Sequence, residues 1–189
     1  MGMTNTNKYI DAYLGYLPEW YNAGIQTYTD GDLTVPGRNI DTFLTEILPF
    51  ILELKQQNSI ILDIGCGNGR MIQALLPYYT NIIGIEPYKK EYEYDKNIDD
   101  YIKDIDLDKY KNDKPKHDIV LMIGFAYMFN NNPSKLYEIL NLITNENALI
   151  IISGDPNNTT EVHECFSKMF KLERTIEINK DYYYVLYSK

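Results

Sequence analysis

The feature that most constrains this chain is a run of apolar residues that leads into three closely spaced glycines. Residues 60–64 read Ile-Ile-Leu-Asp-Ile, and Gly65, Gly67 and Gly69 follow at alternate positions. A continuous apolar run is typical of a parallel strand buried on both faces, and glycines permit a tight turn and a close approach of the backbone to a ligand. Apolar residues at helical spacing come next, at positions 71, 72, 75 and 76. The segment predicts a strand–turn–helix unit of an α/β sheet, with a nucleotide-type pocket at the carboxyl end of the strand.

The spacing of these glycines separates two kinds of cofactor site. A dinucleotide-binding fingerprint has the form Gly-x-Gly-x-x-Gly, which from Gly65 requires a glycine at position 70. The chain has Arg70 there, and its third glycine comes one position earlier, at Gly69. The spacing therefore disfavours an NAD-dependent oxidoreductase, which is kept as an alternative.

The pattern Asp63-x-Gly65-x-Gly67-x-Gly69 closely resembles the first motif of the class I S-adenosylmethionine-dependent methyltransferases. The resemblance implies that the glycine turn passes the methionine part of S-adenosyl-L-methionine close to the backbone, and that Asp63 supports this turn. It places Cys66 and Asn68 at turn positions beside the cofactor. It covers roughly residues 40–189, with specific motifs only up to Tyr127.

The resemblance also implies a fold. It is an α/β fold with a Rossmann-like, seven-stranded, mostly parallel sheet that is flanked by helices and ends in a C-terminal antiparallel hairpin. Residues 172–178 and 182–187 predict the two strands of that hairpin, because short runs of strand-forming residues flank Asn179-Lys180-Asp181.

A second strand is predicted at residues 81–85, which read Asn-Ile-Ile-Gly-Ile, and Glu86 follows it directly. A Rossmann-like site has an acid at the end of its second strand, about twenty residues after the glycine turn, that accepts the ribose hydroxyls. A carboxylate can accept two hydrogen bonds from a diol. We therefore expect Glu86 to bind the ribose and Pro87 to line the adenine.

A third strand is predicted within residues 98–105, ending at Asp104. The resemblance implies that Asp104 accepts a hydrogen bond from the adenine amino group and that Ile105 packs on the adenine ring. The segment is rich in acids, so a solvated charge run is the alternative interpretation.

A central fourth strand is predicted by Asp118 and the five apolar residues that follow it. Gly124 and Phe125 then fall at its carboxyl end, beside the cofactor. Many small-molecule methyltransferases carry a histidine in the following loop, whereas this chain has Tyr127 and Met128 there. The chain also lacks the Asn/Asp-Pro-Pro-aromatic motif of many nucleic-acid amino-methyltransferases.

Tyr127 is the best-placed candidate for a catalytic group, as a base or as an orienting hydrogen-bond partner. His117 comes before the fourth strand and is expected at its far end. His163 lies within a late helical pattern and is expected at the surface or in packing.

The length of 189 residues favours a single domain over residues 1–189. Within it, residues 1–40 are expected to form an aromatic N-terminal lid segment, and residues 41–189 are expected to form the cofactor-binding core. Pro49 falls inside a helical apolar pattern and is expected to kink or split that helix. The expected walls of the acceptor pocket are Trp20, Tyr21, Tyr28, Tyr127 and Asn130. Ordinary packing is the alternative for each aromatic residue, since the chain has 18 tyrosines.

The composition of the chain favours some classes of substrate and partner and disfavours others. The net charge is −9, and binding to nucleic acid depends on lysine and arginine side chains that neutralise phosphates. A nucleic-acid substrate is therefore disfavoured, and a small-molecule or peptide acceptor is favoured. No metal site is expected, and no apolar run is long enough to span a membrane. The two cysteines do not suggest a disulfide framework, which favours a cytoplasmic location.

The leading hypothesis is an enzyme that transfers a methyl group from S-adenosyl-L-methionine to a small-molecule acceptor by in-line displacement. The main alternative is a non-catalytic or regulatory partner protein that binds the same cofactor. A nucleic-acid methyltransferase is less favoured. The chain is compatible with a monomer or a homodimer.

Overall fold

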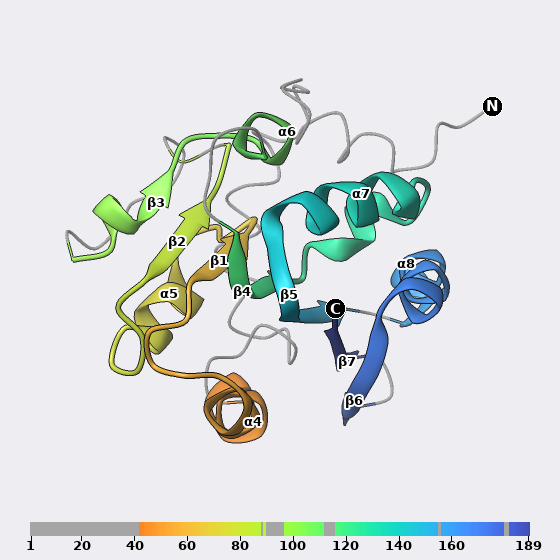
Figure 1. Ribbon diagram of the computed structural model, residues 1–189, viewed down its shortest axis with the longest axis horizontal. Coiled ribbons are helices and arrows are strands. Elements are labelled where there is room, and N and C mark those ends of the chain that lie inside the picture. The colour runs from red at the N-terminus through yellow and green to blue at the C-terminus, as the bar shows by residue number, and fades with distance from the viewer. Residues whose placement is uncertain (1–41, 88, 90–96, 112–115, 155, 180–181) are drawn as a thin grey trace.

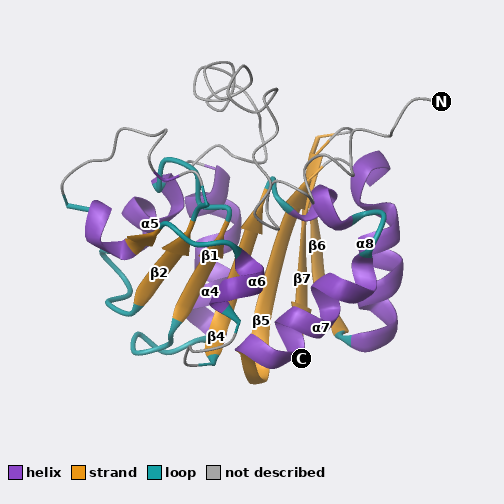
Figure 2. Ribbon diagram, turned by 90° about the horizontal axis from the view of Figure 1, so that it is seen from above, coloured by secondary structure: helices purple, strands orange, loops and turns teal. Residues whose placement is uncertain are grey.

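The computed structural model describes residues 42–189 with the exception of 88, 90–96, 112–115, 155 and 180–181. Its strands are β1 (Ile61–Ile64), β2 (Ile82–Ile85), β3 (Ile102–Lys103), β4 (His117–Ile123), β5 (Thr144–Gly154), β6 (Lys171–Asn179) and β7 (Tyr182–Ser188). They form one seven-stranded sheet in the order β3-β2-β1-β4-β5-β7-β6. Figure 2 shows this order from β2 to β6.

Strands β1 to β5 run parallel to one another, and β7 runs antiparallel to both β5 and β6. The predicted mostly parallel sheet and its C-terminal hairpin are therefore confirmed. Because the order of strands changes direction between β1 and β4, the carboxyl ends of these two strands flank the crevice where ligands bind in open α/β sheets.

Helices cover both faces of the sheet (Figure 1). The helical elements are η2 (Phe43–Ile47), α4 (Leu48–Leu54), α5 (Arg70–Leu75), η4 (Asp99–Tyr101), α6 (Leu107–Tyr110), η5 (Ala126–Phe129), α7 (Pro133–Ile143) and α8 (Pro156–Met169). One apolar cluster packs η2, α4 and α5 on one face, and a second packs α6, η5, α7 and α8 on the other. Within β4, Val120 and Leu121 enter opposite clusters, as the alternation of side chains along a strand requires.

The first helical pattern is split, as Pro49 led us to expect. A π-helical turn at Phe43–Ile47 precedes α4, and Pro49 is the second residue of α4. Proline has no N–H, so it cannot donate to the carbonyl four residues earlier, and the regular α-helical ladder is interrupted there.

His117 lies at the start of β4, at the end of the strand opposite to Gly124, as predicted. It is fully buried, with Nδ1 3.0 Å from the Ile143 carbonyl oxygen and Nε2 3.0 Å from the Tyr110 hydroxyl. A carbonyl only accepts, so Nδ1 carries the proton and the Tyr110 hydroxyl donates to Nε2. Burial lowers the pKa of His117, so this histidine is neutral and joins α6, β4 and the end of α7.

None of the helices in the described part of the chain has the length and apolar character that crossing a membrane requires.

Candidate functional site

The turn after β1 is built from backbone conformations that favour glycine. Gly65, Gly67 and Gly69 have φ values of 69°, 52° and 78°, all in the left-handed region. The Gly65 N–H donates to the Ile85 carbonyl at 3.0 Å, which ties the turn to the end of β2. A Cβ at Gly69 would lie 2.8 Å from the side chain of Ile102. The glycine spacing therefore serves both the turn and its packing against β2 and β3.

A further glycine, Gly84 in β2, lets the turn lie directly on the neighbouring strand. A Cβ at Gly84 would lie 2.6 Å from Cys66 Sγ and 2.5 Å from Ile72 Cδ1. Burial, with the nearby Asp63 and Glu86 carboxylates, raises the pKa of the Cys66 thiol, so Cys66 packs as a protonated thiol. The sequence analysis did not assign Gly84 to the site, although a glycine inside an apolar strand is a known signal of close approach.

Two buried acids meet beneath this turn. Asp63 in β1 and Glu86 after β2 are each only 2% exposed. Glu86 Oε2 accepts a hydrogen bond from the Gly67 N–H at 3.2 Å. Asp63 Oδ2 is buried and has no hydrogen-bond partner among the described residues. Burial first, and then the charge of Glu86, raise the pKa of the Asp63 carboxyl to about 7.

This pair of acids tests whether the predicted cofactor fits. A buried carboxylate oxygen without a partner is costly, and a ligand that brings hydroxyl donors or a positive charge satisfies it. A ribose diol and a sulfonium centre are groups of these kinds. The residues present therefore fit the group that the glycine motif implies.

The ends of β2 and β3 lie at the same edge of the sheet. The Glu86 N–H donates to the Lys103 carbonyl at 3.0 Å, so the residues that follow the two strands are held close together. Asp104 is exposed, and Ile105 is half-buried against the core. Pro87 is half-buried. The adenine contacts of Pro87, Asp104 and Ile105 stay predictions.

The loop after β4 completes this edge. Gly124 has a φ of 66°, and its N–H donates to both the side-chain and backbone oxygens of Ser153, at 3.0 and 3.2 Å. Phe125 is 1% exposed and packs its ring edge-on to Phe129. Ser153 is fully buried at the end of β5. Sequence reasoning missed Ser153, since no local pattern shows which residue of β5 faces Gly124.

The residues predicted to contact the acceptor, Tyr127 and Asn130, lie on η5 and directly after it. Tyr127 is half-buried and packs against the core. Asn130 Oδ1 accepts hydrogen bonds from the backbone N–H groups of Glu161 at 2.9 Å and Val162 at 3.3 Å. Asn130 therefore ties the loop after β4 to α8, a contact that the sequence did not indicate. Its place in a pocket wall and the catalytic role of Tyr127 stay predictions.

Several predicted residues fall outside the part of the chain that the structure describes. They are Trp20, Tyr21 and Tyr28, together with the lid segment 1–40. Within the described residues, Cys66 and Asn68 lie in the turn as predicted, and Asn68 Oδ1 accepts a hydrogen bond from Arg70 Nε at 3.2 Å. The described residues hold no group of three or more metal-ligating side chains.

Comparison with known proteins identifies the family. The family model described as "Methyltransferase domain" matches residues 37–174 of this chain. No curated protein sequence matches it.

Solved structures share the fold. A SAM-dependent methyltransferase from Aquifex aeolicus has a TM-score of 0.64 and 17% identity, over 88% of this chain and 97% of that one. Magnesium protoporphyrin IX methyltransferase from Synechocystis PCC 6803, solved with bound SAM, has a TM-score of 0.61 and 12% identity, over 98% and 92%. The plantazolicin methyltransferase BpumL, solved with a triazolic desmethylPZN analog and SAH, has a TM-score of 0.61 and 14% identity, over 97% of this chain and 95% of that one. At these identities the likeness establishes the fold.

Proposed function

Since this chain belongs to the methyltransferase domain family and is an S-adenosylmethionine-dependent methyltransferase, we propose that it acts on a small-molecule acceptor. The buried acidic pair Asp63 and Glu86 beneath the glycine turn suits the cationic cofactor. The observation that most supports a small-molecule acceptor is the net charge of −9, which disfavours a nucleic-acid backbone as substrate.

Different residues around the turn bind different parts of the cofactor. S-adenosylmethionine supplies an electrophilic methyl group on a positively charged sulfur. The glycines after β1 leave room for its methionine part, and Glu86 accepts the ribose hydroxyls. The same carboxylate accepts a hydrogen bond from the Gly67 N–H, which holds it at the turn. Asp63, whose carboxyl pKa is raised to about 7 by burial and by the charge of Glu86, lies beneath the site.

The contribution of the protein to the reaction is chiefly alignment of the two reactants. We assign the acceptor side to the loop after β4, where Tyr127 orients the acceptor by a hydrogen bond or takes its proton. Gly124, held by Ser153, positions this loop at the carboxyl end of β4.

Turnover tests the proposal on Tyr127 and on the acceptor together. Formation of S-adenosylhomocysteine is measured with phenols, carboxylic acids, amines and thiols, beside RNA and peptides. We expect a small molecule to be methylated, and Tyr127→Phe to lower kcat about 100-fold while the Kd of S-adenosylmethionine stays within about twofold. Tyr137→Phe, on α7, is the matched control. Methylation of RNA or peptides alone would exclude the proposed acceptor class, and cofactor binding without any turnover would favour the regulatory alternative.

A separate prediction concerns Ser153. In Ser153→Ala the Gly124 N–H loses its side-chain acceptor and keeps only the backbone one. We expect the affinity for S-adenosylmethionine to fall about twofold to tenfold, the effect of one neutral hydrogen bond. Calorimetric titration measures this, with the exposed Ser167→Ala as the control. An unchanged affinity in a folded Ser153→Ala variant would show that Ser153 does not position the loop.

A further inference from the structure

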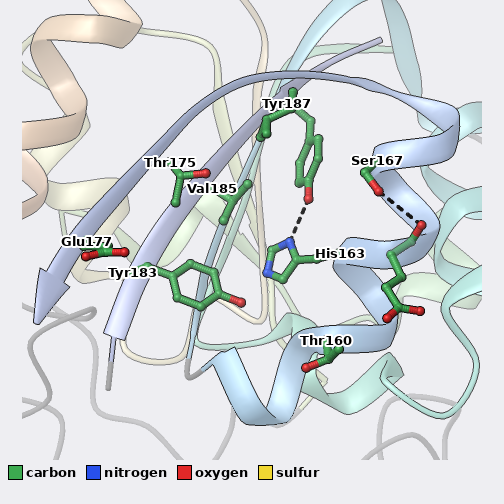
Figure 3. Close-up of a pocket in the computed structure, with 10 residues that line it drawn as sticks. Thr160, His163, Ser167, Thr175, Glu177, Tyr183, Val185 and Tyr187 are labelled. Carbon is green, nitrogen blue, oxygen red and sulfur yellow. Dashed lines mark hydrogen bonds between the residues drawn. The ribbon is translucent and has the colours of Figure 1, made fainter. Parts of the chain in front are cut away.

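A groove lies between α8 and the two outer strands β6 and β7 (Figure 3), and the proposed function uses none of the residues that line it. Its volume is about 540 Å³, within the range of small-molecule sites. His163 and Glu164 line it from α8, Glu177 from β6, and Tyr183 and Tyr187 from β7.

The groove is distinct from the cofactor site. The glycine turn follows β1, and the strand order places β4 and β5 between β1 and β7. At about 4.8 Å per strand, β7 lies roughly 14 Å across the sheet from β1.

Aromatic rings line the groove and hydrogen bonds hold them in place. The ring of His163 lies 5.1 Å from that of Tyr183 and 5.9 Å from that of Tyr187, centroid to centroid. His163 Nδ1 is 2.8 Å from the Tyr187 hydroxyl, and the Tyr183 hydroxyl is 2.6 Å from Thr159 Oγ1. Figure 3 shows His163 on α8 facing both tyrosines of β7. Tyr183 is half-buried and offers a π face to a ligand, whereas Tyr187 is 2% exposed and holds His163 through its hydroxyl.

The charge of the groove is negative. Glu164 and Glu177 come from opposite walls, and in the described part of the chain neither carboxylate forms a salt bridge with a lysine or arginine. Burial lowers the pKa of His163 to about 4, so its ring is uncharged at neutral pH. His163 Nε2 is buried and has no hydrogen-bond partner among the described residues. The lining residues therefore include no cation at neutral pH.

We propose that this groove binds a small organic cation with an apolar body, of the arylalkylamine class. Tyrosine faces attract a cation through the ring quadrupole. The two carboxylates add charge attraction from both walls, and Val185 and Leu172 provide apolar contact. An anion of the same shape meets two like charges and no partner.

Nuclear magnetic resonance tests the proposal directly, because the chain has only two histidines. The full-length protein is titrated with phenethylamine, and the ring signals of His163 and His117 are followed. We expect the His163 signals to move saturably, with a millimolar Kd, while those of the fully buried His117 stay in place. We expect 2-phenylethanol to bind at least about threefold more weakly, and 3-phenylpropanoate to bind more weakly still.

Substitutions in the groove test which residues cause the preference for a cation. The double variant Glu164→Gln with Glu177→Gln is expected to weaken phenethylamine binding about threefold to tenfold, the effect of two exposed charge pairs. Glu138→Gln, an exposed glutamate of α7, is the matched control and should leave the Kd unchanged. Tyr183→Leu removes a π face and should also weaken binding.

Two results would overturn the proposal. One is that His163 signals do not respond to the amine. The other is that the alcohol, the carboxylate and the amine bind wild type equally, which would leave an apolar groove without preference for a cation. The titration contains no cofactor and reads no methyl transfer, so its failure does not bear on the proposed methyltransferase function.

Discussion

Replacing Glu86 with alanine is expected to weaken the binding of S-adenosylmethionine about 10- to 100-fold. The carboxylate is 2% exposed and is held against the Gly67 N–H, where we propose that the ribose binds. Each hydrogen bond to a charged group contributes about 1.5–3 kcal/mol, and 1.4 kcal/mol is a factor of ten in Kd. Calorimetric titration of S-adenosylmethionine and S-adenosylhomocysteine measures the loss.

The controls separate binding from folding. Glu86→Gln keeps one acceptor oxygen and should fall between alanine and wild type. Glu138→Ala removes a carboxylate from the exposed face of α7 and should leave the Kd unchanged. Thermal unfolding checks that Glu86→Ala remains folded. A folded Glu86→Ala variant with wild-type affinity would remove Glu86 from the cofactor site.

The second large effect is on the pH dependence of stability, through Asp63. Its carboxyl has a pKa of about 7 in the folded protein, against the ordinary value of 3.8. Between these two values the folded state keeps a proton that the unfolded state has lost. The free energy of unfolding therefore falls as the pH rises through this window, and it is lowest above pH 7, where Asp63 is ionised in both states. A shift of roughly three pKa units corresponds to about 4 kcal/mol.

Asp63→Asn should remove this dependence, because an amide does not titrate. In urea unfolding of the ligand-free protein between pH 4 and pH 8, wild type should lose stability relative to the variant as the pH rises. The difference in the free energy of unfolding between the two proteins at each pH removes the contribution of the titratable groups that both proteins contain. Asp100→Asn, at an exposed position, is the matched control and should track wild type. Parallel pH profiles for wild type and Asp63→Asn would contradict the raised pKa.

The strands that the sequence predicts best are those buried on both faces. β1, β2 and β4 consist mostly of apolar residues, because helices cover both sides of the sheet where they lie. The prediction of the third strand is less accurate. This strand is only Ile102–Lys103, is preceded by a 3₁₀ turn at Asp99–Tyr101, and pairs with β2 alone. An edge strand of two residues has no periodicity to detect.

The residues of the candidate site also fall into those that the sequence predicts and those that it does not. Asp63, Glu86 and the glycines of the turn are local to two strand ends, so their spacing along the chain is enough to place them. Gly84 and Ser153 act on residues far from them in sequence, and their roles depend on which strands become neighbours. Likewise, His163 fits a helical pattern on α8, but the two tyrosines that it faces come from β7, 20 or more residues later.

Asn130 joins the loop after β4 to the helix α8 through two hydrogen bonds. Two backbone amides in the body of the helix, at Glu161 and Val162, donate to the side chain of another segment. Moving Asn130 away from α8 breaks both of these hydrogen bonds. His163, which lines the groove, is the next residue of the helix. Hydrogen exchange at these two amides therefore reports whether the contact between the loop and α8 stays closed.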